Sequence, residues 1–220
     1  MKRYSTYMIV AALIALSVQA ELLVGWDEFD GNTMSTYQAA DHAASGCSGS
    51  LTYSSSGSMH DWKGGSTTST DGTYGTMGSG AGGGQGLLTF CTNNNPAYLE
   101  ISFTNNTGDS LVLSNFCFDA YIRATYGSPH NYSLSIVGGD LALTNDFATG
   151  KFTIASGVAV SPYTYDFPND IDVDLAGLPD RTLADGESVV FRLSVYDDAS
   201  PRSFYTIIDN IGIFGGTIIP

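Results

Sequence analysis

Residues 97–104 read Ala-Tyr-Leu-Glu-Ile-Ser-Phe-Thr, and this short stretch decides the fold class. Leu99, Ile101 and Phe103 alternate with polar residues, which is the pattern of a β-strand with one buried face and one wet face. The alternation returns at residues 132–136, 171–175 and 189–195. Turn signals rich in Asn, Asp and Gly separate the runs, at 93–96, 105–109, 138–140 and 184–186. Many short strands with frequent turns predict an all-β protein, an antiparallel β-sandwich of jelly-roll-like form.

The composition supports one folded domain. Of 220 residues, 43% are apolar and 14% charged, which is enough apolar side-chain surface for a core. We expect a single domain over residues 21–216 and a tail at 217–220. No segment of twelve or more residues has a convincing helical period, and the best helix candidate is the short stretch 37–44.

The charge balance is strongly acidic. The sequence has 22 Asp and Glu residues against 8 Lys and Arg, a formal net charge of −14. Such a field repels DNA, RNA and anionic membrane surfaces, so we exclude nucleic acid as a partner. Most of the acids are Asp, a residue of turns and strand ends, which agrees with a β-rich fold.

The first twenty residues are typical of a secretory signal peptide. Lys2 and Arg3 precede an apolar run at 8–16, and residues 17–20 read Ser-Val-Gln-Ala, a cleavage site after Ala20. The apolar run is too short to span a bilayer, and no later stretch is long enough. We expect a mature chain without an integral membrane segment, secreted or held at the cell surface.

The segment 45–86 departs from the alternation, because it consists mostly of Gly, Ser and Thr. Such a composition cannot bury a core of its own, so we expect a long surface loop or a flexible excursion between two strands. Exposed aromatic rings beside hydrogen-bonding groups are typical of sugar-binding sites. The candidate ligand-binding residues are His60, Asp61, Trp62, Tyr74 and Tyr126. The alternative is that these rings fold down and cover the sandwich.

Three cysteines stand in the expected mature chain, at Cys47, Cys91 and Cys117. An oxidising compartment favours one disulfide among them. If the strand that starts near Cys47 and the strand that ends at Cys91 are antiparallel neighbours, these two cysteines meet, so we predict the Cys47–Cys91 pair. Cys117 lies between two phenylalanines and is predicted to be a buried free thiol. No Cys/His cluster has the spacing of a zinc site.

Motifs for catalysis are missing from the sequence. It has no G-x-S-x-G nucleophile elbow, no P-loop and no HExxH. The stretch 78–83 matches a dinucleotide-binding fingerprint by letters alone, without the flanking strand and helix. A sandwich-fold glycosidase needs two facing carboxylates, and none of the four glutamates has an acidic neighbour two residues away within a predicted strand. Asp172 and Asp174 share one strand face, which we interpret as solvated.

Asp209 is the acid with the most unusual position in the pattern. Under strict alternation it shares the core-facing side of its strand with Ile211 and Ile213. A buried carboxylate must be hydrogen-bonded, paired or metal-bound. One interpretation is a hydrogen bond to a turn, or a bulge that turns the side chain outward. The other is a structural Ca²⁺ site, because calcium prefers carboxylate oxygens. The predicted ligands are Asp209, Asp27, Glu28 and Asp30.

The last forty residues resemble a known family. Residues 183–193 read Leu-Ala-Asp-Gly-Glu-Ser-Val-Val-Phe-Arg-Leu, and 208–213 read Ile-Asp-Asn-Ile-Gly-Ile. They resemble the end of the exported β-sandwich domains of PEP-CTERM proteins, surface proteins of Gram-negative bacteria that make exopolysaccharide; residues 99–119 are also similar. The resemblance implies a jelly-roll fold, a cell-surface or matrix setting and no catalytic residues. The family's sorting tail is absent from this sequence, which either stops just before that tail or belongs to a member released without an anchor.

Together these patterns favour an exported, non-enzymatic module that binds polysaccharide or other matrix components. One alternative is a glycoside hydrolase or polysaccharide lyase of sandwich fold. Another is a structural adhesin or appendage subunit, which would expose an unpaired edge strand. Asn105 and Asn131 each stand in an Asn-x-Ser/Thr sequon, and their glycosylation depends on the host.

Overall fold

The computed structural model describes residues 20–27, 37–53, 60–61, 74, 87–91, 96–122, 130–152, 167–197 and 204–217. The strands are β1 (Glu21–Trp26), β2 (Tyr37–Ala39), β3 (His42–Ala43), β4 (Cys47–Tyr53), β5 (His60–Asp61), β6 (Leu87–Cys91), β7 (Ala97–Asn105), β8 (Leu111–Ile122), β9 (His130–Gly139), β10 (Thr144–Lys151), β11 (Phe167–Asp174), β12 (Thr182–Leu183), β13 (Ser188–Asp197) and β14 (Phe204–Thr217). A short 3₁₀ turn, η1 (Leu175–Gly177), follows β11.

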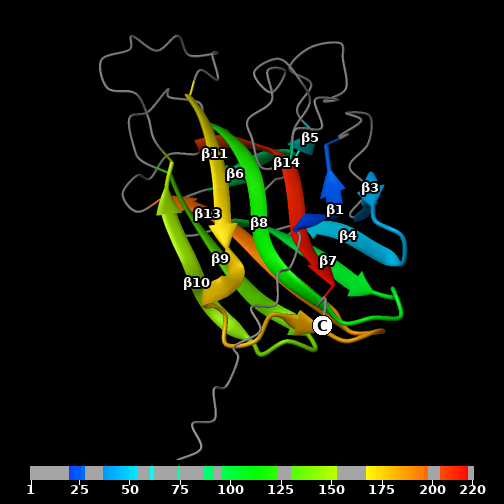
Figure 1. Ribbon diagram of the computed structural model, residues 1–220. Helices are drawn as coiled ribbons and strands as arrows, with labels where there is room; N and C mark the ends of the chain where they lie inside the picture. Colours follow the sequence, from blue (N-terminus) through cyan, green and yellow to red (C-terminus); the bar gives the residue numbers. More distant parts are fainter. Residues whose placement is uncertain are drawn as a thin grey trace, which may run out of the picture.

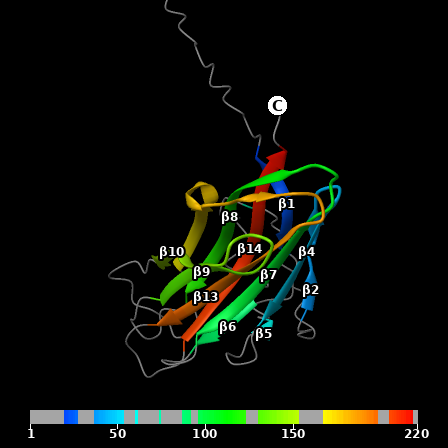
Figure 2. The ribbon, with the colours of Figure 1, turned by 90° about the horizontal axis from the view of Figure 1, so that it is seen from below.

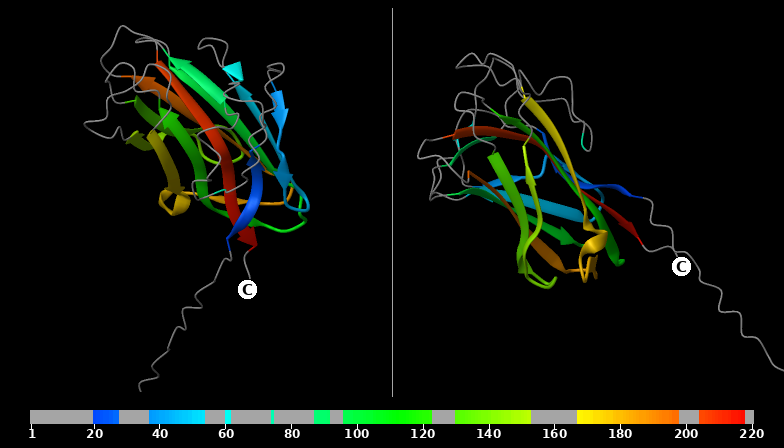
Figure 3. Two further views of the ribbon diagram at one scale, coloured as in Figure 1. Left: turned by 90° about the horizontal axis from the view of Figure 1, so that it is seen from above. Right: turned by 90° about the vertical axis from the view of Figure 1, so that its left-hand side faces the viewer.

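The strands form two sheets packed face to face (Figures 1 and 3). The six-stranded sheet has the order β10-β9-β13-β7-β4-β2. The eight-stranded sheet follows β11-β8-β14-β1-β3, with β12 beside β8, β6 beside β14 and β5 beside β6. Every strand pairing in the described residues is antiparallel. The predicted antiparallel, jelly-roll-like β-sandwich is therefore confirmed.

Alternation along the central strands builds the core. On β7 burial alternates residue by residue, so Leu99, Ile101 and Phe103 face the opposite sheet. Phe191 on β13 meets Phe116 on β8 across the two layers, with ring centroids 5.3 Å apart. Each fully buried side chain of this size stabilises the fold by roughly 1.5–3 kcal/mol. The core lies where the period of two predicts it.

Predicted turn signals join several of these strands. Residues 105–109 connect β7 to β8, which belong to different sheets, and residues 184–186 connect β12 to β13. Gly139, at the end of β9, has a φ of +90°. A Cβ at this position would lie 2.4 Å from the carbonyl oxygen of Ser188, so only glycine fits there.

The helix considered at residues 37–44 is not formed. Instead β2 lies at the edge of the six-stranded sheet and β3 at the edge of the eight-stranded sheet. The indole N–H of Trp26 donates to the carbonyl oxygen of Gln38 at 3.4 Å, which helps to hold β2 on the sandwich. Pairing with the two sheet edges gives hydrogen-bond partners to the backbone N–H and C=O groups of this short stretch. An isolated helix of that length is unstable.

The Gly/Ser/Thr-rich segment 45–86 is not a loop throughout. Its residues 47–53 form β4, which pairs with β7 from Cys47↔Asn105 to Tyr53↔Leu99. Gly49 permits this pairing, because a Cβ there would lie 2.9 Å from the ring of Trp26. Residues 54–59, 62–73 and 75–86 lie outside the described residues.

Cys47 and Cys91 do not lie on neighbouring strands. β4 belongs to the six-stranded sheet and β6 to the eight-stranded sheet, and Cys47 is a free thiol. The predicted disulfide is therefore wrong, because the chain crosses to the other sheet after β4 instead of returning beside it. Cys117 is a buried free thiol, as predicted, with 3% of its surface exposed.

The predicted signal peptide at 1–20 falls almost entirely outside the described residues and stays a prediction. Within the part of the chain that the structure describes, no helix is long and apolar enough to cross a membrane.

Candidate functional site

The candidate site lies where β14 changes its neighbour on one side. β14 pairs with β8 along nearly its whole length (Figure 2). On its other side it pairs first with β6, as far as Ile208↔Leu87, and then with β1, starting at Ile211↔Trp26. Asp209 and Asn210 fall in the gap between β6 and β1.

A β-bulge at this gap sets the direction of Asp209. Asn210 has a φ of +48°, and the β8–β14 register shifts between Asp209 and Gly212. The extra residue places both Ile208 and Ile211 in the core, so Asp209 points to the outer face of the eight-stranded sheet. The expectation from strict alternation was therefore wrong, and a bulge turns the side chain away from the core. Asp209 is nevertheless only 1% exposed.

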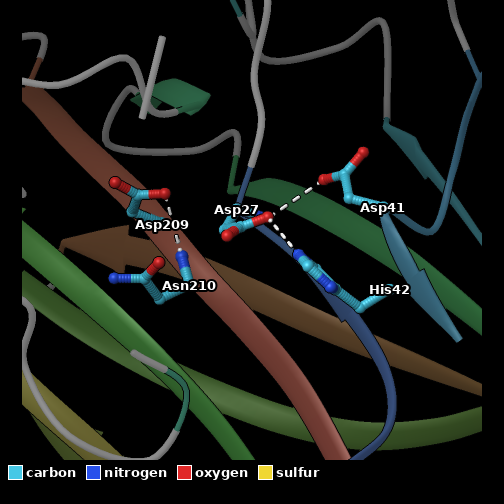
Figure 4. A network of polar contacts seen from close by, with 5 residues as sticks. All are labelled: Asp27, Asp41, His42, Asp209 and Asn210. Atoms are coloured by element: carbon cyan, nitrogen blue, oxygen red, sulfur yellow. Dashed lines mark hydrogen bonds and ion pairs between the residues drawn. The ribbon is translucent and has the colours of Figure 1, made fainter. Parts of the chain in front are cut away.

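Asp119 on β8 is the direct cross-strand partner of Asp209. It stands between core residues Phe118 and Ala120, so it also faces outward, and it is 2% exposed. Asn210 contacts both acids. Its backbone N–H donates to Asp209 Oδ1 at 2.9 Å (Figure 4), and its Nδ2 donates to Asp119 Oδ2 at 2.8 Å. The sequence search missed this facing pair of carboxylates because it compared acids within one strand, whereas Asp119 and Asp209 meet across two strands that are far apart in sequence.

Asp27 directly follows β1 on the other side of the gap and is 3% exposed. Its Oδ1 lies 3.1 Å from Nε2 of His42, and its backbone N–H donates to Oδ2 of Asp41 at 3.0 Å (Figure 4). The pairing of Gly25 with His42 brings both polar residues to the end of β1. The side chain of His42 is 51% exposed, so the pair with Asp27 is open to solvent on one side.

Tyr74 packs over the same place. Its ring lies against Gly25 and Gly212 and meets the His42 ring edge-on, with centroids 5.6 Å apart. The hydroxyl is buried. Burial raises the pKa of Tyr74, and the negative charges of Asp27, Asp41 and Asp209 raise it further, so the phenol stays neutral at physiological pH. The ring is thus folded onto the sandwich; its predicted ligand contact stays a prediction.

We call this group the polar corner: Asp27, Asp41, His42, Tyr74, Asp119, Asp209 and Asn210. Two of its buried polar atoms, Oδ1 of Asn210 and the hydroxyl oxygen of Tyr74, have no hydrogen-bond partner among the described residues. No group of three or more His, Cys, Asp or Glu side chains in the described residues is arranged to hold a metal ion. Glu28 and Asp30, two of the predicted calcium ligands, lie outside the described residues.

The predicted ligand segment reaches the same corner. His60 and Asp61 form β5, and Asp61 pairs with Leu87 of β6. Leu87 in turn pairs with Ile208, the residue before the bulge. Two strand spacings, roughly 10 Å, therefore separate the backbone of Asp61 from β14 at the gap. Trp62 and Tyr126 lie outside the described residues.

Sequence reasoning did not find Asp41, His42 or Asn210. A local signal existed for Asn210, since Asn adopts the left-handed backbone region more readily than other non-glycine residues. Asp41 and His42 had no such signal, because their positions depend on the pairing of β3 with β1, two segments that no periodicity links.

A second group of polar and aromatic side chains lies on the outer face of the six-stranded sheet. The register Arg192↔Glu100↔Thr52↔Tyr37 runs across four strands, and we call these residues the outer row. Nε of Arg192 donates to Oε1 of Glu100 at 3.0 Å, and the guanidinium lies 4.5 Å from the centre of the Tyr98 ring. The side chains of Arg192 and Glu100 are 37% and 32% exposed, and Tyr37 is 55% exposed.

No protein-family model and no curated protein matches this chain. Several solved structures are similar to it. The mannan-recognising carbohydrate-binding module TmCBM27 superposes with a TM-score of 0.49 at 11% identity, covering 90% of this chain and 99% of that one. The CBM22-1 xylan-binding domain from Paenibacillus barcinonensis gives 0.40 at 9% identity, covering 93% and 99%. The K3 cleaved adhesin domain of Lys-gingipain from Porphyromonas gingivalis gives 0.42 at 16%, covering 89% and 99%. At these scores the similarities say nothing about a ligand of this chain.

Proposed function

We propose that this protein is an exported, non-enzymatic β-sandwich module that binds polysaccharide. The observation that carries the proposal is the outer row with Tyr98 beside it, on the face of the six-stranded sheet that points away from the core. A sugar ring has C–H groups on its faces and hydroxyls on its edge. An aromatic ring can stack on the C–H groups, and the charged and hydroxyl side chains beside it can hydrogen-bond the sugar hydroxyls.

The outer row is already ordered before a ligand arrives. Glu100 holds Arg192 by a hydrogen bond, and Arg192 lies over the ring of Tyr98. A side chain that is fixed in advance loses less conformational freedom on binding, so more of the contact energy remains as affinity. Thr52 and Glu100 offer donors and acceptors within the same row.

The negative net charge of the protein argues against an anionic polysaccharide as the ligand. At a formal charge of −14, an anionic polysaccharide would be repelled over a long range at low salt. We therefore propose a neutral glycan as the ligand.

Affinity electrophoresis in gels with soluble neutral polysaccharides, at millimolar calcium, tests this function. We expect Tyr98→Ala to weaken retardation by a neutral glycan about tenfold, equivalent to about 1.4 kcal/mol. Leu143→Ala is the matched control, because Leu143 is 71% exposed and outside the outer row. Wild-type protein that binds no glycan would refute the proposal.

The residues predicted from sequence remain part of the proposal as a second contact region: His60, Asp61, Trp62, Tyr74 and Tyr126. A Trp62→Ala variant in the same gels separates the two regions. Loss of binding in Trp62→Ala with full binding in Tyr98→Ala would move the ligand site to segment 45–86 and away from the outer row.

We also propose a structural Ca²⁺ ion at the polar corner, held by Asp209 and Asp27 with Glu28 and Asp30. Support comes from two carboxylates that are 1% and 3% exposed, and from the unfilled Oδ1 of Asn210. Carboxylate and amide oxygens are the ligands that calcium prefers. A cation there would offset the cost of burying two carboxylates.

One observation favours a second candidate function, a glycoside hydrolase. Asp119 and Asp209 face each other on neighbouring strands, the arrangement that such enzymes need. Against it, both acids are almost fully buried, which leaves a glycosidic bond no access to them. A reducing-sugar assay decides: release of reducing ends by wild type but not by Asp119→Asn would establish the hydrolase.

The proposed setting is the surface or matrix of a Gram-negative bacterium, as the PEP-CTERM resemblance implies. Export predicts that the mature protein begins at Glu21. N-terminal sequencing of protein recovered from the periplasm or medium tests this, and a chain that retains residues 1–20 would contradict it.

A further inference from the structure

Two glycines face each other on the outer face of the eight-stranded sheet. Gly25 of β1 and Gly212 of β14 are direct cross-strand partners. Core residues Val24 and Trp26 flank Gly25, so it lies on the outward side of its strand. Because neither residue has a side chain, the backbone at this pair can be approached closely by another group, beside the polar corner.

The ring of Tyr74 fills this patch. A Cβ on Gly25 would lie 2.6 Å from Cζ of Tyr74, which is closer than any real contact, and a Cβ on Gly212 would lie 3.2 Å from its Cδ1. Alanine at position 25 would therefore push the ring away, whereas alanine at position 212 would require a shift of only a few tenths of an ångström. The two glycines act as a socket that is shaped for a flat aromatic ring.

Polar residues surround the rim of the socket. The His42 ring contacts Tyr74 edge-on, and Nε2 of His42 is paired with Asp27. The buried hydroxyl of Tyr74 lies among the carboxylates of Asp27, Asp41 and Asp209. A neutral phenol suits this place, because it can donate to a carboxylate.

Tyr74 is preceded and followed by long Gly/Ser/Thr-rich stretches, so its contact with the socket affects a large part of the chain. Tyr74 stands between β5 and β6, with residues 62–73 before it and 75–86 after it, most of them Gly, Ser and Thr. Ordering such a chain costs much conformational entropy, and one fixed point within it divides a long closed segment into two shorter ones.

We infer that Tyr74 is an anchor: its ring docks in the Gly25–Gly212 socket and fixes this one point of the chain, between β5 and β6, to the β1–β14 pair. This goes beyond the proposed function: it requires neither glycan nor calcium. It also ties a segment in the middle of the chain to its first and last strands, the two sides of the polar corner.

Limited trypsin digestion of the full chain tests the inference, because Lys63 is the only Lys or Arg between residues 62 and 86. We expect Tyr74→Ala and Gly25→Ala to raise the rate of cleavage after Lys63 about tenfold. Cleavage after Lys151, on β10, serves as the internal reference and should not change. Tyr74→Phe keeps the ring and should stay within about twofold of wild type.

Gly177→Ala is the matched glycine control, since a Cβ there meets nothing within 4 Å. Thermal melting of each variant separates local release from global unfolding, which would raise cleavage at both lysines. Equal cleavage after Lys63 in wild type and a folded Tyr74→Ala would overturn the inference. So would faster cleavage in Gly177→Ala than in Gly25→Ala.

Discussion

Asn105, at the end of β7, ties two turns together through one buried side chain. The two hydrogens of its Nδ2 are shared among three carbonyl oxygens within hydrogen-bond distance, and its Oδ1 accepts from the N–H and the hydroxyl of Thr107. The carbonyls belong to Asp109, Leu183 and Ala184, at 2.8, 2.9 and 3.1 Å. The amide has no room for a glycan in the folded protein, so this sequon residue has a structural role.

Replacing Asn105 with Ala should lower the free energy of unfolding by about 2–4 kcal/mol, since it removes the side chain's hydrogen bonds and leaves the buried carbonyl oxygen of Leu183 without this partner. Urea unfolding followed by circular dichroism measures this. Asn106→Ala is the control, because Asn106 is exposed and its backbone N–H, not its side chain, bonds Gly46. Equal losses in the two variants would contradict the role of Asn105.

The two described thiols should differ in reactivity. Burial raises the pKa of Cys117, and Asp172, whose carboxylate accepts from the thiol at 3.4 Å, raises it further. Cys47 is half-buried; burial raises its pKa, as does the charge of Glu21. Iodoacetamide at pH 8, without reductant, should therefore alkylate Cys47 before Cys117. Mass spectrometry checks the order, and alkylation of Cys117 before Cys47 would contradict it.

At the scale of elements, regular strands could be predicted from the sequence, but the side-chain directions in the bulged strand β14 could not. Alternation located β7, β9, β11 and β13, because a period of two survives wherever a strand is regular. In β14 the bulge adds one residue at Asn210. Residues before the bulge therefore point to the opposite side of the sheet from the side that alternation, counted back from Ile211, predicts. Strict alternation therefore placed Asp209 on the wrong face, and the bulge that the sequence had left open as one interpretation turns it outward, opposite Asp119.

The bulge itself can be tested with two variants of Asn210. Asn210→Gly keeps the left-handed backbone and loses the bond to Asp119, whereas Asn210→Val also strains the backbone. We expect the Val variant to be less stable than the Gly variant by about 1–2 kcal/mol. Equal stability in urea unfolding would mean that the strand can straighten without cost.

At the scale of the whole molecule, the proposed calcium ion should stabilise the fold by mass action. Calcium at a hundredfold excess over its Kd should add about 2.7 kcal/mol, seen as a rise in Tm. Asp209→Asn should remove that rise, while Asp109→Asn, which changes an exposed acid in the turn between β7 and β8, should keep it. If a chelator leaves the wild-type melting curve unmoved, the ion is absent.

Stability should also fall at alkaline pH. The pKa of the Cys117 thiol is raised in the folded state, so the unfolded chain releases its proton first, from about pH 8.5. The stabilisation is complete below that pH and is lost as pH rises towards the folded pKa. Cys117→Ala should make the decline of Tm between pH 8 and 10 shallower, and Ser48→Ala should leave it unchanged. The same slope in all three proteins would contradict the assignment.

The pairing of β1 with β14 has a consequence for the folding pathway. Glu21 pairs with Gly215, so this contact joins nearly the two ends of the sequence. Contacts between such distant residues close the longest loops, and they form late during folding. The Tyr74 socket spans both strands, so it should also be completed late. Variants of the socket should therefore speed unfolding while leaving the refolding rate almost unchanged.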